Sequence, residues 1–239
     1  MKNKACGIPF YIYVFVAIGL LCTAFLGSKA VTIMAEKAPV THRSKVIIDA
    51  GHGGVDGGAT SCTGVLESNI NLEIALKLDD LFHLLGVQTV MIRTGDYSVY
   101  TEGQTIAAKK ISDLKERVRI AEETENATVI SIHQNYYPEE KYSGAQVFFN
   151  NNPESKALAQ ALQSQFIATV NPGRNRRIKK ADGVYFMEHI TCPGVLVECG
   201  FLSNPAEEAK LRNHDYQNDL CCVIAATCSQ YLQRESHLA

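Results

Sequence analysis

The sequence predicts a single α/β domain with a mixed, mostly parallel sheet and helices on both faces. Three apolar, β-branched runs carry this prediction: Val46-Ile47-Ile48, Thr128-Val129-Ile130-Ser131-Ile132 and Gly194-Val195-Leu196-Val197. Segments with helical periodicity separate them, which is the pattern of repeated strand–helix–strand units. The chain has 239 residues, 46% of them apolar, which is enough for one such core and a short extra segment.

The first strand–helix–strand unit is the clearest. The glycine-rich loop at residues 53–64 separates the first strand from a helix expected at residues 69–85. Ser68 is the expected N-cap residue and Gly86 the expected residue just beyond the helix, because serine favours the cap and glycine the left-handed conformation that follows a helix. Residues 87–92 are apolar again and form the next strand. Strands joined in this way are parallel.

The rest of the chain continues the alternation. The expected elements, in chain order, are a helix around residues 114–121, a strand at 128–132, a strand at 145–149, a helix at 153–170, a short strand near 184–185, a strand at 194–197 and a last helix at 215–233. Asn152 or Pro153 starts the second of these helices. Two long polar loops, residues 93–112 and the basic segment 171–180, connect the elements.

The first thirty residues differ from the rest. Lys2 and Lys4 precede an uncharged apolar stretch, residues 8–27, which has the composition of a secretory leader. The stretch is also close to the length of a membrane span. Residues 1–30 are therefore a cleaved signal peptide or an N-terminal membrane anchor, residues 31–43 a linker, and residues 44–236 a folded domain that acts outside the cytoplasmic membrane.

Composition excludes some classes of protein. The net charge of −2 argues against a nucleic-acid partner, since such proteins usually carry a strong basic excess. The eight cysteines include no Cys-x-x-Cys pair, so they do not form a metal-binding pattern. Cys192, Cys199 and Cys228 lie in apolar surroundings and are expected to be small buried residues. An extracytoplasmic location permits disulfides, but their pairing cannot be read from the sequence.

Each of the three apolar runs leads into a residue that can bind a metal ion or move a proton. His52 lies among glycines just after the first strand, His133 ends the second and Glu198 ends the third. Because the working crevice of an open α/β sheet lies beyond the carboxyl ends of its strands, neighbouring parallel strands would bring these side chains together. Glu67 stands at the entrance of the first helix and points back to the same edge. Each residue alone could be structural, but the coincidence favours a site.

This set matches the needs of a catalytic zinc ion. Such ions take three protein ligands from histidine and carboxylate and keep one position for water. His52, Glu67 and His133 supply those ligands for one Zn²⁺ per chain, and Glu198 is then free to act as the general base. Glu67 alone would also be explained by the helix dipole, which favours acidic residues near the N-terminus.

At these residues the chain resembles a known family. The segments Ile48-Asp49-Ala50-Gly51-His52-Gly53-Gly54, Ser131-Ile132-His133-Gln134-Asn135 and Val197-Glu198-Cys199-Gly200-Phe201-Leu202-Ser203-Asn204 are similar to motifs of the zinc-dependent N-acetylmuramoyl-L-alanine amidases of the amidase-3 family. The resemblance spans about residues 45–233. It implies zinc held by His52, Glu67 and His133, catalysis by Glu198, and hydrolysis of the amide between muramic acid and L-alanine in peptidoglycan.

Further similarities are to the sporulation amidases of the CwlD type. They lie at residues 101–118, at Ser143-Gly144-Ala145-Gln146 and in the short leader without cell-wall-binding repeats. They imply a spore-forming bacterium and removal of stem peptides in the spore cortex, so that muramic δ-lactam forms and is read at germination. Ala50, Gln134 and Tyr136 depart from the family pattern beside the site. Restraint of such an enzyme requires timing, location or a regulatory protein partner, which the sequence does not identify.

Four residues are weaker candidates for substrate binding: Asn135, Arg117, Arg176 and Lys179. Arg117 takes the place of an arginine often seen in the family, and it either orients Glu198 or a substrate carboxylate, or is a helix-surface charge. Arg176 and Lys179 belong to the basic loop, which either binds stem-peptide carboxylates or is a solvated charge run. Asp49 is either a partner of a ligating histidine or a simple strand-end acid.

Two other functions fit the same chemistry less well. A zinc peptidase or deacetylase acting on another wall bond would use the same ligands, because activated water does not itself select the amide. An inactive peptidoglycan-binding regulator is the alternative outside the enzymes. That alternative predicts the loss of one of His52, Glu67, His133 and Glu198, and all four are present.

Overall fold

The computed structural model describes residues 44–238, without the side chains of residues 235–238. The expectations for residues 1–30 and 31–43 lie outside this range. Six strands form one sheet in the order β2-β1-β3-β6-β4-β5. Their bounds are β1 Lys45–Ala50, β2 Gln88–Met91, β3 Ala127–Asn135, β4 Gln146–Phe149, β5 Lys179–Lys180 and β6 Gly194–Phe201. Only the β4–β6 pair is antiparallel among these strands, which confirms the mixed, mostly parallel sheet.

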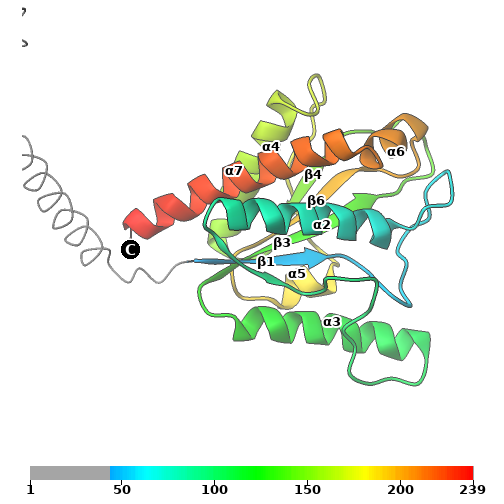
Figure 1. Ribbon diagram of the computed structural model, residues 1–239, viewed down its shortest axis with the longest axis horizontal. Helices are drawn as coiled ribbons and strands as arrows, with labels where there is room; N and C mark the ends of the chain where they lie inside the picture. Colours follow the sequence, from blue (N-terminus) through cyan, green and yellow to red (C-terminus); the bar gives the residue numbers. More distant parts are fainter. Residues whose placement is uncertain (1–43, 239) are drawn as a thin grey trace, which may run out of the picture. The chain divides into compact units, whose positions relative to one another are not determined.

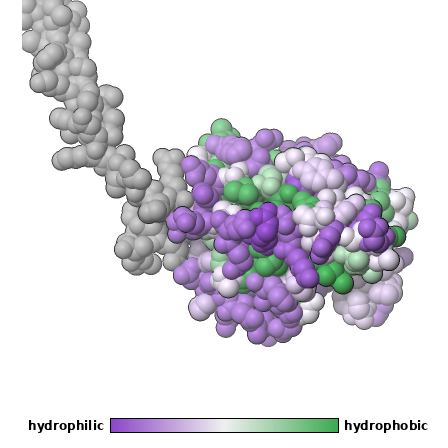
Figure 2. All heavy atoms as spheres, turned by 90° about the horizontal axis from the view of Figure 1, so that it is seen from below, coloured by the Kyte–Doolittle hydropathy of each residue, from purple (hydrophilic) through white to green (hydrophobic). Residues whose placement is uncertain are grey.

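Helices cover both faces of the sheet, as predicted. Their bounds are α2 Glu67–Leu84, α3 Ile106–Glu123, α4 Pro153–Ala168, α5 Tyr185–His189, α6 Pro205–Leu211 and α7 His214–Leu238. Figure 1 shows α2, α4 and α7 on one side and α3 and α5 on the other. Figure 2 views the molecule from the α3 side, where hydrophilic side chains cover most of the visible surface. No helix within residues 44–238 is long and apolar enough to cross a membrane.

Side chains alternate between the two faces along each central strand. In β6, Val195 and Val197 belong to the core under α2, α4 and α7, whereas Leu196 belongs to the smaller core under α3 and α5. The period of two in a strand therefore places Glu198 on the α3–α5 side of the sheet. The same alternation in β3 places His133 on that side, since Ile130 and Ile132 face the other core. The sheet itself thus aligns the second histidine with the glutamate.

The start of α2 differs from the prediction. The helix begins at Glu67, and Leu66 occupies the N-cap position without a side-chain hydrogen bond. Ser68 is not the cap, because the glycine loop itself satisfies the first amides of the helix. The amide of Glu67 donates to the carbonyl of Ala59, and that of Ser68 to Gly57. The other end is confirmed, because Gly86 follows the helix with a φ of 74°.

The predicted strand near residues 184–185 is wrong. Val184 is the N-cap residue of the short helix α5, which begins at Tyr185. The edge strand is β5 instead, inside the segment that the sequence predicts to be a loop. Its residue Lys179 pairs with Phe148 of β4. A two-residue edge strand of lysines has no apolar alternation, so only the neighbouring strand defines it.

Two further helix boundaries depend on local caps. Helix α3 starts at Ile106, earlier than predicted, because the side chain of Thr105 accepts a hydrogen bond from the amide of Ala108. Helix α6 was not predicted from the sequence, although Asn204 caps it and Pro205 begins it. Asn152 caps α4, as expected. The cysteines within the described residues are free, and Cys199 and Cys228 are buried as expected, whereas Cys192 is partly exposed.

Candidate metal centre

The strand ends bring the predicted site residues together. His133 of β3 is the direct neighbour of Glu198 in the β3–β6 pair. The amide of Gly51, just beyond β1, donates to the carbonyl of Ile132 at 3.0 Å, so His52 emerges next to His133. The two imidazole rings lie edge to face with centroids 5.0 Å apart. Glu67 joins them from the first turn of α2.

Three of these side chains offer converging ligand atoms. Glu67 Oε1 lies 3.3 Å from His52 Nε2 and 3.0 Å from His133 Nδ1. One ligand atom from each residue lies within 4.8 Å of the others. Bonds of 2.0–2.2 Å from zinc to nitrogen and oxygen fit ligand atoms at such separations. The donor set, two imidazoles and one carboxylate, is one of the known catalytic zinc sets. These residues therefore fit the ion that the sequence predicts.

The backbone at this point is shaped for the two histidines. His52 has a φ of 61°, a left-handed conformation that is uncommon outside glycine. Gly51 has no room for a side chain, because a Cβ there would lie 2.2 Å from His133 Nε2. The absence of a side chain at residue 51 thus lets the second imidazole pack against the end of β1.

Glu67 is held as a carboxylate. Its Oε2 accepts from the amide of Ala59 at 2.9 Å, and its Oε1 accepts from the amide of Gln134 at 3.1 Å. Burial alone would raise the pKa of Glu67, but the hydrogen bonds from His133 and His52 hold it far below its usual range. A carboxylate that stays ionised is ready to bind a cation.

An outer carboxylate, Asp56, was not among the predicted site residues. Its Oδ2 lies 2.9 Å from His52 Nδ1 and 3.0 Å from Lys110 Nζ. Burial opposes a charge on the ring, yet the bonds to Asp56 and Glu67 raise the pKa of His52 to about 9. This hydrogen bond directs Nε2 of His52 toward Glu67, which is how outer carboxylates orient zinc-binding histidines. Its signal in the sequence was an aspartate four residues after the histidine in the glycine loop.

Glu198 lies beside the ligand cluster without belonging to it. Its Oε2 is buried and has no hydrogen-bond partner among the described residues. Burial raises the pKa of Glu198 to about 7, the charge of His133 lowers it, and that of Glu67 raises it further. A carboxyl with a pKa near neutrality both accepts and donates protons, as a general acid–base requires.

Comparisons with known proteins show the family of the chain. The family model Amidase_3, described as N-acetylmuramoyl-L-alanine amidase, matches residues 46–229. The chain belongs to this family. The resemblance inferred from the motifs is confirmed, and amidase activity follows from the membership.

Individual members of the family are similar over most of the chain. A germination-specific N-acetylmuramoyl-L-alanine amidase of Bacillus subtilis (strain 168) is 35% identical over 181 residues, which are 75% of this chain and 76% of that protein. The CwlD amidase from Clostridioides difficile, solved in complex with the GerS lipoprotein, has a TM-score of 0.77 at 35% identity over 80% of this chain and 99% of that chain. The catalytic domain of CwlV, an amidase from Bacillus (Paenibacillus) polymyxa var. colistinus, has a TM-score of 0.68 at 30% identity over 80% and 98%.

Arg117 has a different place in this amidase from the one expected. It is 2% exposed, so it is not a helix-surface charge. Its guanidinium pairs with Asp49 and Asp113 and donates to the carbonyl of His52 at 2.7 Å. These acceptors engage each of the three guanidinium nitrogens of Arg117 within the protein. Asp49 likewise partners Arg117 and Ser131 and not a histidine, which agrees with its interpretation as a strand-end acid.

A second buried arginine, Arg93, was also not predicted. It is fully buried and donates to the carbonyls of Ala50 at 2.7 Å and Gly51 at 3.0 Å. It also donates to the carbonyl of Ser68 in α2 at 2.9 Å. Together with Arg117 it fixes the loop that carries His52 to both neighbouring elements.

The remaining predicted residues lie on both sides of β6, Asn135 on β3 and the basic loop beside β4. Asn135 ends β3, where its carbonyl accepts from the amide of Leu202 at 2.8 Å. Arg176 and Lys179 line a pocket near the start of β4, together with Gln146, the direct neighbour of Glu198 in the sheet. The basic loop thus reaches the same face as the metal centre.

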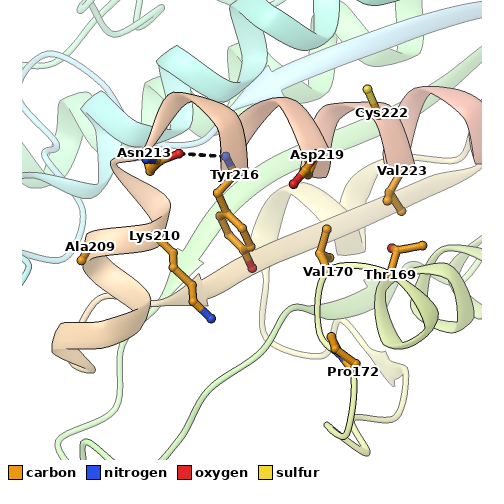
Figure 3. A pocket seen from close by; sticks show the side chains of 10 residues that line it. All are labelled: Thr169, Val170, Pro172, Ala209, Lys210, Asn213, Tyr216, Asp219, Cys222 and Val223. Atoms are coloured by element: carbon orange, nitrogen blue, oxygen red, sulfur yellow. Dashed lines mark hydrogen bonds between the residues drawn. The ribbon is translucent and has the colours of Figure 1, made fainter.

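A larger hollow lies elsewhere, against α6 and α7 (Figure 3). It measures about 880 Å³ and includes Val170, Lys210, Tyr216 and Val223 in its walls. The residues of the metal centre are not among those that line it. This hollow is therefore separate from the cluster of His52, Glu67 and His133 at the strand ends.

Proposed function

We propose that the protein hydrolyses the muramoyl-L-alanine amide of peptidoglycan with one zinc ion per chain, held by His52, Glu67 and His133. The observation that carries this proposal is the convergence of three ligand atoms within 4.8 Å of one another. Zinc in such a site supplies Lewis acidity, which activates water and polarises a carbonyl oxygen.

Glu198 performs the proton transfers in this proposal. Its carboxylate takes a proton from the attacking water as the water oxygen bonds to the lactyl carbonyl carbon. It then gives that proton to the amide nitrogen, and the carbon–nitrogen bond breaks. The products are a muramic acid with a free lactyl carboxylate and a stem peptide with a free L-alanine amino group. Before a metal ion binds, the pKa of Glu198 is about 7, close to the pH at which one group can both accept and donate a proton.

We further infer that the substrate is spore-cortex peptidoglycan, where removal of stem peptides precedes formation of muramic δ-lactam. The support is the similarity to the germination-specific amidase of Bacillus subtilis and to CwlD. The CwlD structure contains a lipoprotein, GerS, which makes a lipoprotein a reasonable regulatory partner for this chain as well. The reaction takes place outside the cytoplasmic membrane, in agreement with the interpretation of residues 1–30 as a signal peptide or membrane anchor. Asn135, Arg176 and Lys179 are proposed to contact the substrate.

Product analysis tests the proposal. The purified protein is incubated with cortex peptidoglycan and zinc, and the new chain ends are identified by mass spectrometry. Free L-alanine amino termini without new reducing sugar ends are expected. New termini within the stem peptide would show a peptidase, and loss of acetyl groups a deacetylase. Absence of any product with zinc bound would favour a peptidoglycan-binding protein.

A further inference from the structure

A basic pocket adjoins the proposed catalytic glutamate. It has a volume of about 360 Å³, and its cationic lining residues are Lys141, Arg174, Arg176, Arg177 and Lys179. Gln146, which also lines it, lies directly opposite Glu198 in the antiparallel β4–β6 pair. Side chains at directly opposite positions share one face of a sheet, so the pocket and Glu198 open on the same side.

Strand register extends this row by one more strand. Phe148 lies two residues after Gln146 in β4 and therefore faces the same side. Lys179 of β5 pairs with Phe148, which turns the lysine side chain to that face too. Lys180, the next residue, is exposed but projects from the opposite face. The strand register thus places Lys179, and not the adjacent Lys180, on the side of the pocket.

Arg176 is fixed in the wall of the basic pocket. It donates from Nε to the carbonyl of Ser143 at 3.1 Å and from one terminal nitrogen to Gln146 Oε1 at 3.2 Å. Its guanidinium also lies 4.5 Å from the ring centre of Phe201. The amide nitrogen of Gln146 in turn donates to the carbonyl of Arg177 at 2.7 Å. Gln146 therefore ties the basic loop to the strand beside Glu198, which a freely solvated charge run would not require.

Most of the five cations of the pocket have no ion-pair partner among the described residues. In the part of the chain that the structure describes, no carboxylate forms an ion pair with Arg174, Arg177 or Lys179. Lys141 pairs with Glu139. Clustered like charges repel one another, and an anion that enters such a hollow is attracted. Arginine and lysine side chains around a small hollow suit a carboxylate.

The distance between the basic pocket and Glu198 indicates which anion the pocket binds. Strands lie about 4.8 Å apart, so β5 is about 10 Å from Glu198 on β6. An extended peptide covers about 3.4 Å per residue, so a chain leaving the scissile amide reaches the pocket within about three residues. Stem peptides of peptidoglycan carry carboxylates at such positions. The separation between Glu198 and the basic pocket therefore matches the distance from the scissile amide to a carboxylate on the leaving peptide.

We propose that the basic pocket binds a carboxylate of the stem peptide and thereby selects substrates whose stem carboxylates are free over those in which they are amides. This inference rests on the proposed function, because it uses the amide next to Glu198 as the origin of the stem. Lys179 and Arg177 are its specificity-determining residues. Arg176 positions the loop through Ser143 and Gln146.

The test compares two muramoyl-peptide substrates that differ only in free or amidated stem carboxylates, using the full-length zinc-loaded protein. The quantity measured is the ratio of KM for the amidated substrate to KM for the free one. We expect this ratio to exceed one, and to fall about two- to five-fold in Lys179→Gln, as for one partly exposed ion pair. The double variant Arg177→Gln/Lys179→Gln should bring the ratio close to one. Lys180→Gln is the matched control and should keep the wild-type ratio.

Binding of the cleaved stem peptide and of its carboxamide, measured by calorimetry, separates this inference from the proposed function. Hydrolysis with equal KM for both substrates would refute the role of the pocket and leave the amidase proposal intact. The same would follow if Lys180→Gln changed the KM ratio as much as Lys179→Gln does. The opposite outcome is a protein that binds the free carboxylate preferentially, loses this preference in Lys179→Gln, and releases no L-alanine termini. That result would retain the anion site and refute the proposed hydrolysis.

Discussion

Replacement of Glu198 by glutamine should stabilise the metal-free protein at alkaline pH while abolishing turnover. Burial raises the pKa of this carboxyl from 4.5 to about 7, so the folded state holds the proton more tightly than the unfolded state does. The corresponding free energy is about 3 kcal/mol. It stabilises the wild type fully below pH 4.5 and is lost as the pH rises through 7. Glutamine is neutral throughout and has no such loss.

Urea unfolding of the chelator-treated proteins at pH 4.5 and pH 8 measures this effect. The free energy of unfolding of Glu198→Gln minus that of the wild type should increase by about 3 kcal/mol between the two pH values. His52 also titrates in this range and is present in both proteins; its charge lowers the pKa of Glu198, and the value of about 7 already includes this coupling. Glu140→Gln, at an exposed position, is the control and should show a difference that does not change with pH. A constant difference for Glu198→Gln would refute the burial argument.

The same variant separates catalysis from metal binding. Glu198 is not one of the clustered ligands, so Glu198→Gln should bind zinc with wild-type stoichiometry. Its turnover of peptidoglycan should fall by about 10²–10⁴, the usual contribution of a general acid–base. Near-normal turnover, or loss of zinc, would contradict the role assigned to Glu198.

Three further changes test the surroundings of the site. Asp56→Asn should weaken zinc binding about 10- to 100-fold, because Asp56 orients His52. Competition with a chelator measures the zinc affinity, and the control Asp182→Asn, at an exposed position, should leave it unchanged. Arg117→Met should lower the free energy of unfolding by about 3–5 kcal/mol, because it leaves Asp49 charged and buried without its partner. The control Arg119→Met, on the exposed face of α3, should lower it by less than about 1 kcal/mol, and equal losses would refute the distinction. Gly51→Ala should displace the ring of His133, since the new Cβ would lie 2.2 Å from Nε2, so zinc content by elemental analysis should fall; a fully loaded variant would contradict the close packing.

The strand-end residues could be predicted from the sequence because a parallel sheet converts sequence position into spatial position. An apolar run that ends in His133 places that histidine at the carboxyl edge, whichever residues follow. His52 lies in a loop and Glu67 at the start of a helix, yet the segment between them is short enough to keep them close. The strand pattern therefore suffices to place these residues at one edge of the sheet.

Other features depend on contacts that local sequence does not contain. Ser68 has the right residue type for a cap, but Ala59 and Gly57 satisfy the helix amides, so the helix starts at Glu67. Val184 and Tyr185 favour strands by type, yet the position available beside β4 is taken by Lys179 and Lys180. Tertiary pairing overrides propensity in both cases.

The two buried arginines show the same limit at the site itself. Strand β1 ends at Ala50, whereas its neighbour β3 continues to Asn135, so the loop that holds His52 leaves the ladder while still inside the protein. Buried carbonyls must be paired, and those of Ala50 and Gly51 accept from Arg93 while that of His52 accepts from Arg117. Nothing near either arginine in the sequence marks this task, since the loop lies far away in the chain.

This arrangement makes the geometry of the metal centre depend on residues that never touch the metal. Four guanidinium hydrogen bonds reach the three consecutive carbonyls of residues 50–52: two from Arg93 and two from Arg117. The carbonyl of Gly51 also accepts from the side-chain amide of Asn71, so each of the three acceptors is paired. Loss of either arginine would therefore free the backbone around His52 before it disrupted the sheet, because Gly51 and His52 lie beyond the last β1–β3 pair, Ala50 with Ile132. His52 is thus positioned through its own carbonyl and the two that precede it, and zinc affinity should depend on the two arginines as closely as it depends on Asp56.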